Sequence, residues 1–171
     1  MDGMLLGLHV LDRQLVDRGG VLCGKVDNLL LRWDGRELRL CDLVTGWGAW
    51  PLRLPEWARG FAWRLLGDRA ARVSWQEVQD IDSAVRLSIV AQELTARAEV
   101  LRRPPPGMLL LSQVLGTPLH DQEGRRLGRV HEVEVERQGP SPRALRLLVG
   151  PRVSWRARTS VPPSSEHLEA L

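Results

Sequence analysis

The chain has 171 residues, of which 43% are apolar and 26% are charged, and its net charge at pH 7 is +3. This composition is typical of a folded globular protein with one domain or two small ones, and it argues against a disordered chain. No run of about 18 uncharged apolar residues occurs, and Asp2 stands where a secretory signal peptide carries a basic residue. We therefore expect a cytoplasmic protein without a membrane-spanning helix.

An internal repeat organises the sequence. With Gly24 aligned to Gly128, an offset of 104 residues, two stretches match without a gap. Both share the frame apolar-x-Asp-x-x-Gly-x-x-x-Gly-basic-Val, which predicts a β-hairpin. We expect Asp17 and Asp121 to cap the hairpin turns, and Gly24 and Gly128 to mark bulges that curl the strands. The identical pairs are Val10/Val114, Leu11/Leu115, Leu15/Leu119, Asp17/Asp121, Gly20/Gly124, Gly24/Gly128 and Val26/Val130.

The first copy of the repeat is assigned to residues 1–83. After the hairpin, polar and apolar residues alternate over 36–40, which predicts a strand. A short strand ending in Val-Ser-Trp at 73–75 closes this copy. Between these two strands lies a Trp-rich insertion, residues 46–70, that has no counterpart in the second copy.

The insertion carries the signature of a helix. Trp57, Phe61 and Leu65 recur at a spacing of four residues, which places them on one helical face. Pro55 suits the start of a helix, and Gly67 suits its end. This pattern therefore predicts an amphipathic helix inside the insertion.

Residues 84–107 are predicted to form a helical linker between the two copies. The helix is expected over 91–103, where Glu93 and Arg97 have the spacing of a favourable ion pair. Three prolines at 104–106 end it, because proline lacks the amide hydrogen that a helix needs.

The second copy is assigned to residues 108–158. Valines alternate with glutamates over 132–136, which predicts a strand with one buried and one exposed face. Another strand is predicted over 144–149, and a second Val-Ser-Trp stands at 153–155. The tail, residues 159–171, contains prolines and serines without periodicity, and we expect it to be mobile.

These short strands predict a mainly β fold with a few helices, built as small antiparallel barrels. Leu15–Val26 with Val73-Ser74-Trp75, and Leu115–Val130 with Val153-Ser154-Trp155, resemble the PRC-barrel family. The resemblance covers both copies apart from the insertion and the linker. It implies two PRC-type barrels in tandem, related by a pseudo-twofold axis, and a noncatalytic role in protein interaction or assembly.

Residue patterns that carry chemistry are not found. The sequence has no Gly-x-Ser-x-Gly, no His-Glu-x-x-His and no Walker loop. Cys23 and Cys41 do not form a Cys-x-x-Cys pair, and in the repeat Cys23 aligns with Leu127, as expected of a core residue. The histidines lack metal-ligand spacing; they are His9, His120, His131 and His167. We therefore expect no catalytic residue, no metal and no cofactor.

Tryptophan and arginine gather in the insertion, which holds four of the seven tryptophans of the chain. One interpretation is that these rings cap the open end of a barrel as core residues. The other is an exposed surface, since Trp and Arg are enriched at binding hot spots. Contact of this segment with a membrane surface is a third alternative. The candidate partner-binding residues are Trp47, Trp50, Arg53, Trp57, Arg59, Trp63 and Arg64.

The favoured hypothesis is a nonenzymatic interaction or scaffold protein that binds a protein partner or a second copy of itself. The alternative is an accessory factor for ribosome or RNA assembly, with an arginine strip facing phosphates. A small-molecule site between the barrels is a third hypothesis. The strip would consist of Arg32, Arg36, Arg39, Arg125, Arg126, Arg129, Arg143 and Arg146.

Overall fold

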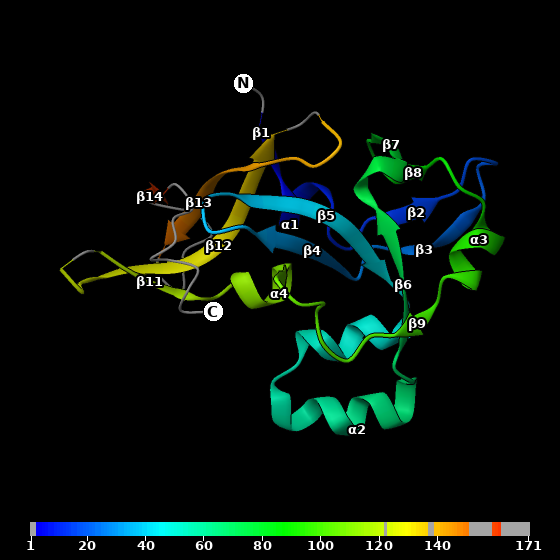
Figure 1. Ribbon diagram of the computed structural model, residues 1–171, viewed down its shortest axis with the longest axis horizontal. Coiled ribbons are helices and arrows are strands. Elements are labelled where there is room, and N and C mark those ends of the chain that lie inside the picture. Colours follow the sequence, from blue (N-terminus) through cyan, green and yellow to red (C-terminus); the bar gives the residue numbers. More distant parts are fainter. Residues whose placement is uncertain (1–2, 122, 137–138, 151–158, 162–171) are drawn as a thin grey trace.

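The computed structural model describes residues 3–121, 123–136, 139–150 and 159–161 (Figure 1). Strands account for 44% and helices for 24%, and the antiparallel sheets curl into a half-barrel. The mainly β fold with a few helices is thereby confirmed. The second Val-Ser-Trp, at 153–155, lies outside the described residues, as does the predicted tail except for 159–161, which form a strand.

One sheet has five strands in the order β10-β4-β5-β6-β9. The strand predicted over 36–40 begins two residues later, at Leu38, and continues to Thr45, where Leu43, Val44 and Thr45 are all buried. The five strands are β10 (Met108–Leu110), β4 (Asn28–Trp33), β5 (Leu38–Thr45), β6 (Arg69–Ser74) and β9 (Glu99–Val100).

A second sheet follows the order β1-β12-β13-β14, with β11 also paired to β12. As predicted, Val133 and Val135 of β12 are fully buried. Glu134 on the other face is also largely covered, because it lies in an ion pair with Arg146 at 2.8 Å. The strands are β1 (Gly3–Leu5), β11 (Pro118–His120), β12 (Arg126–Glu136), β13 (Ala144–Gly150) and β14 (Thr159–Val161).

A smaller sheet has the order β3-β2-β8-β7, in which β2 and β8 run parallel and the other pairs antiparallel. Its strands are β2 (Gln14–Val16), β3 (Leu22–Lys25), β7 (Val78–Ile81) and β8 (Val85–Leu87). The helices of the molecule are all short and connect strands. They are α1 (Leu6–His9), η1 (Trp47–Arg53), α2 (Glu56–Leu66), η2 (Trp75–Glu77), α3 (Ala91–Ala96) and α4 (Leu111–Val114).

Both predicted hairpins form, and they use the same hydrogen bonds. The carboxylate of Asp17 accepts from the backbone N–H groups two and four residues further on, at 2.8 and 2.9 Å. Asp121 does the same at 3.1 and 2.7 Å. A bulge lies beside Gly24 and Gly128, whose φ angles of 139° and 145° disfavour other residues. The sequence frame therefore encodes the turn, the bulge and the curl of each hairpin.

The two copies exchange strands. The N-terminal strand β1 pairs with β12 of the second copy, and β10, the first strand of the second copy, pairs with β4 of the first. Polar side chains reinforce both exchanges. Glu132 of β12 accepts from the N–H groups of Gly7 and Leu8 in α1, at 2.7 and 3.0 Å. Asn28 of β4 accepts from Ser112 N–H in α4, at 3.3 Å. Each copy thus holds the short helix of the other.

One apolar core joins both copies, with fully buried members such as Leu15, Leu43, Val133 and Leu147. Each such side chain contributes about 1.5–3 kcal/mol relative to exposure. A second cluster lies beneath the insertion and includes Leu30. Because the main core is shared, neither copy has a complete interior without the other.

The predicted linker helix is shorter than expected. Helix α3 ends at Ala96, and the predicted helical stretch beyond it includes the strand β9. Glu99 and Val100 pair with the start of β6, whose edge would otherwise be unpaired. The expected Glu93–Arg97 ion pair is present at 3.7 Å. Tertiary pairing therefore overrides the helical pattern after the six residues of α3.

Candidate functional site

The insertion forms two helices at one edge of the molecule. Figure 1 shows α2 as the outermost element, with the short cyan helix η1 between it and the strands. As the spacing predicted, α2 begins after Pro55 and ends at Gly67, whose φ is 81°. The helix is therefore presented outward, on a support built by η1.

Helix η1 anchors the insertion to the sheet. Ala49 and Leu52 are buried in the smaller core cluster. A Cβ added at Gly48 would lie 2.5 Å from both the backbone nitrogen and the carbonyl oxygen of Arg69. The carbonyl of Gly48 accepts a hydrogen bond from Trp63 Nε1 at 3.2 Å, which fastens α2 to η1. These contacts attach the insertion to β6.

The outer face of α2 carries an exposed apolar stripe, which we define as Trp57, Phe61 and Leu65. Their exposed fractions are 87%, 70% and 69%. The opposite side of the helix packs inward through the buried Ala62 and the half-buried Trp63. An amphipathic helix normally turns its apolar face to the core. Here the largest apolar side chains face solvent, which makes the stripe a candidate contact surface.

Helix η1 adds two more exposed rings, Trp47 at 75% and Trp50 at 42%. The insertion therefore has features of both interpretations, the cap on the core and the exposed surface. Helix η1 covers core through its small and aliphatic residues, as the cap interpretation requires, while most of the tryptophan surface is exposed, as the binding interpretation requires.

Three of the candidate residues have structural contacts. Arg53 donates two hydrogen bonds to Asp12, at 2.9 and 3.1 Å, and thereby holds the pKa of the Asp12 carboxyl below its usual value. Arg59 donates to the carbonyl of Leu54 at 2.9 Å. The ring of Trp63 lies 5.8 Å from the guanidinium of Arg102. Arg53, Arg59 and Trp63 therefore position the surface.

The remaining candidates, Trp47, Trp50, Trp57 and Arg64, are exposed and available. Phe61 and Leu65 share this exposed surface, although they were not among the candidate residues. Their spacing of four and eight residues from Trp57, which predicted the helix, could also have placed them on the same face as Trp57. Two charged residues of α2, Glu56 and Arg64, are exposed and have no ion pair within the part of the chain that the structure describes.

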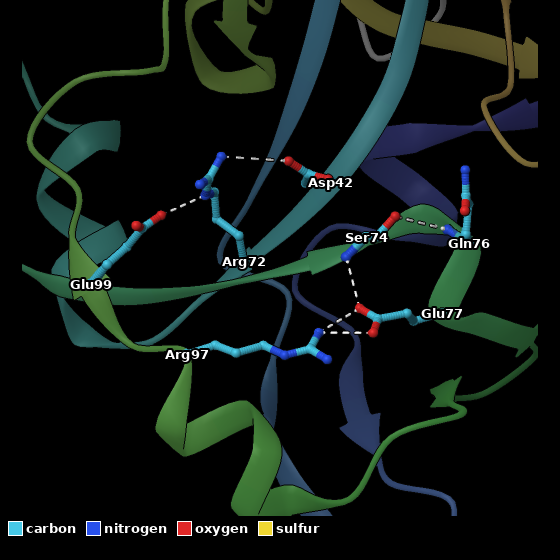
Figure 2. A pocket seen from close by; sticks show the side chains of 7 residues that line it. All are labelled: Asp42, Arg72, Ser74, Gln76, Glu77, Arg97 and Glu99. Carbon is cyan, nitrogen blue, oxygen red and sulfur yellow. Dashed lines mark hydrogen bonds and ion pairs between the residues drawn. The ribbon is translucent and has the colours of Figure 1, made fainter.

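A charged pocket of about 630 Å³ lies beside β6, and none of the stripe residues lines it (Figure 2). Its arginines are directed at its carboxylates: Arg72 lies 2.6 Å from Glu99, and Arg97 lies 2.7 Å from Glu77. Ser74 accepts from the N–H of Gln76 and, with Glu77, caps the helix η2. Burial raises the pKa of Asp42 at the pocket wall. The charged groups of the pocket are therefore paired with one another. The Arg72–Glu99 ion pair connects β6 to β9, and the Arg97–Glu77 ion pair connects the end of α3 to η2.

A second pocket, of about 590 Å³, lies where Met4 and Gly139 approach η2 and β7. Two acidic side chains line it, and both are occupied by local turns. Asp80 accepts from the next backbone N–H at 2.8 Å, and Asp82 accepts from the N–H of Ala84 at 2.9 Å. No nucleophile and base converge among its lining residues.

Four of the eight arginines of the proposed strip are paired with carboxylates. Arg146 pairs with Glu134 at 2.8 Å, and Arg143 pairs with Glu37 and Glu136 at 3.1 and 3.0 Å. Arg125 pairs with Asp121 at 2.7 Å, and Arg39 pairs with Glu37. These contacts lower the positive potential that a phosphate backbone would meet.

Within the described ranges, no group of three or more His, Cys, Asp or Glu side chains is arranged to hold a metal ion. Of the helices that the structure describes, none has the length and apolar content that a membrane crossing requires. No protein-family model matches the sequence, and no curated protein matches it significantly.

Proposed function

We propose that this chain is a noncatalytic interaction module with two PRC-type barrels, and that it binds a protein partner through the exposed surface of the insertion. The observation that carries the proposal is the outward-facing stripe Trp57, Phe61 and Leu65 on a firmly anchored helix. Aromatic anchors on a rigid support are typical of binding hot spots, because little conformational entropy is lost when they are covered.

Support for the two-barrel interpretation comes from backbone hydrogen bonds that recur at the repeat offset. Asp12 N–H donates to Val26 at 2.8 Å, and Gly116 N–H donates to Val130 at 2.7 Å. In addition, Arg39 forms a bridge with Arg143, the residue 104 positions later. A residue that faces its own equivalent is expected at a twofold axis. The reciprocal exchange of β1 and β10 favours the same symmetry.

The proposal is tested by photo-crosslinking in cells from which the protein is purified under denaturing conditions. A photoreactive phenylalanine analogue replaces Phe61, and the same analogue at Leu22, which is 66% exposed on β3, serves as the matched control. We expect a discrete protein adduct from position 61 that is lost when Trp57→Ser is added, and none from position 22.

Adducts with RNA alone, or equal adducts from both positions, would contradict a protein-binding role for the stripe. The RNA result would support the accessory-factor alternative instead, despite the ion pairs that occupy Arg143 and Arg146.

A further inference from the structure

We propose that the partner bound by the stripe is a second copy of this chain, and that two α2 helices pack antiparallel across a twofold axis. This inference rests on the proposed function and names its partner. Three features of α2 carry it: the symmetry of the stripe, the position of the two free charges, and the exposed area.

The stripe is self-complementary. Trp57 and Leu65 lie four residues before and four residues after Phe61, on the same face. In an antiparallel pair centred on Phe61, the two phenylalanines meet at the axis, and Trp57 of each copy lies against Leu65 of the other. Each large ring is thus matched with a smaller side chain. A twofold interface requires this kind of surface, because the same patch serves both sides.

The free charges select the antiparallel orientation. Glu56 and Arg64 are eight residues apart, so a helical period of 3.6 residues places both on the same flank of the stripe. In the antiparallel pair, Glu56 of one copy is offset from Arg64 of the other by roughly 3 Å along the helix axis. Two equivalent ion pairs would form at the rim. In a parallel pair, Glu56 of one copy would instead lie about 12 Å along the axis from Arg64 of the other, so these ion pairs would not form.

Space for the second helix is present. Gly60 lies on the exposed flank of the stripe, four residues from both Glu56 and Arg64, and a Cβ built there meets no atom within 4 Å. The partner's helix can therefore approach the backbone on this flank. A large residue at the same position would separate the two helices.

The area fits a dimer of modest strength. An aromatic side chain covers about 150–250 Å² when buried. The exposed fractions of the three stripe residues therefore offer several hundred Å² on each copy. This lies toward the lower limit of stable interfaces, which bury about 800 Å² per partner. We expect an equilibrium between monomer and dimer that depends on concentration.

An anionic membrane is the less favoured occupant of the stripe. Its headgroups would attract Arg64 but repel Glu56, which lies on the same flank. In the antiparallel dimer both charges gain a partner. The charge pattern therefore suits a second copy better than a uniformly negative surface.

The test is sedimentation equilibrium of the full chain over about a thousandfold range of concentration. We expect wild type to dimerise, and Glu56→Arg or Arg64→Glu to weaken the dimer by about tenfold each, because like charges then meet at the rim. The double variant Glu56→Arg/Arg64→Glu should restore the affinity to within about threefold. Arg103→Glu, an exposed residue outside α2, makes the same charge change as Arg64→Glu and should have little effect.

Circular dichroism of each variant establishes that it is folded. A wild type that stays monomeric at every concentration overturns the dimer, as does a dimer that neither single charge reversal weakens. Binding of the monomer to vesicles of anionic lipid, but not to itself, would assign the stripe to a membrane and also overturn the inference. If a monomer still forms a protein adduct from position 61, only the inference fails and the proposed function stands.

Discussion

At the scale of single residues, the repeated aspartate of the sequence frame is explained by the hydrogen bonds that its carboxylate accepts in the hairpin turn. Asp17 accepts from two N–H groups of its own turn, and also from the N–H of Ala91 at 3.1 Å. It therefore connects the first hairpin to the start of α3. The second copy retains the turn bonds at Asp121, where the side chain of Arg125 adds a further contact at 2.7 Å.

The charge of Asp17 should make stability depend on pH in acid. Hydrogen bonds from the backbone of Val21, Ala91 and Gly19 lower its pKa below the ordinary value of 3.8. The carboxylate therefore stabilises the fold above that value, and the contribution is lost as the pH falls through the lowered pKa. We expect Asp17→Asn to have a lower melting temperature than wild type at pH 7 and a smaller difference from it in acid. A difference that stays constant with pH would contradict this assignment.

Gly48 and Gly60 provide a matched pair of substitutions. A Cβ at Gly48 would collide with the backbone of Arg69, so Gly48→Ala should destabilise the protein by about 2–4 kcal/mol. At Gly60 nothing lies within 4 Å, so Gly60→Ala should stabilise α2 by about 0.5–1 kcal/mol. Urea denaturation measures both. Equal effects at the two positions would show that η1 does not rest on β6 as described.

At the scale of elements, two strand pairs hold the copies together: β1 of the first copy pairs with β12 of the second, and β10 of the second pairs with β4 of the first. Asn28 is fully buried, and it donates from Nδ2 to the hydroxyl of Ser112 at 2.9 Å while accepting from the N–H of the same residue. The contact joins β4 of the first copy to α4 of the second. Glu132 makes the corresponding contact with α1. These polar contacts connect segments more than 80 residues apart in sequence.

A double-mutant cycle tests this connection. We expect Asn28→Ala to destabilise the protein by about 2 kcal/mol, since it leaves buried backbone groups without partners, and Ser112→Ala by about 1 kcal/mol. The double variant should be more stable than the sum predicts, with a coupling of about 1 kcal/mol in urea denaturation. Purely additive effects would mean that the two side chains do not interact.

At the scale of the whole molecule, sequence reasoning succeeded where the signal is local. The hairpins follow from Asp and Gly at fixed spacing, and α2 follows from Trp57, Phe61 and Leu65 between Pro55 and Gly67. The candidate surface was placed in the right segment by the concentration of Trp and Arg, but this composition left out Phe61 and Leu65, which the helical spacing puts on the same face as Trp57.

Features that depend on distant pairing could not be predicted in this way. The strand β9 replaces part of a predicted helix because Arg69 and Ala70 offer an unpaired edge. The exchange of β1 with β10 depends on contacts between copies, which the repeat alone does not specify. Likewise, half of the arginine strip is paired with carboxylates, such as Glu37, which lies next to Arg143 only in the folded chain.

The most direct test of the stripe as a contact surface is hydroxyl-radical footprinting with mass spectrometry on dilute and assembled protein. We predict that Trp57, Phe61 and Leu65 are oxidised readily in the dilute protein and are protected after assembly, while Leu22 stays reactive in both. Side chains of the stripe that resist oxidation in the dilute protein, or that remain equally reactive after assembly, would contradict the account.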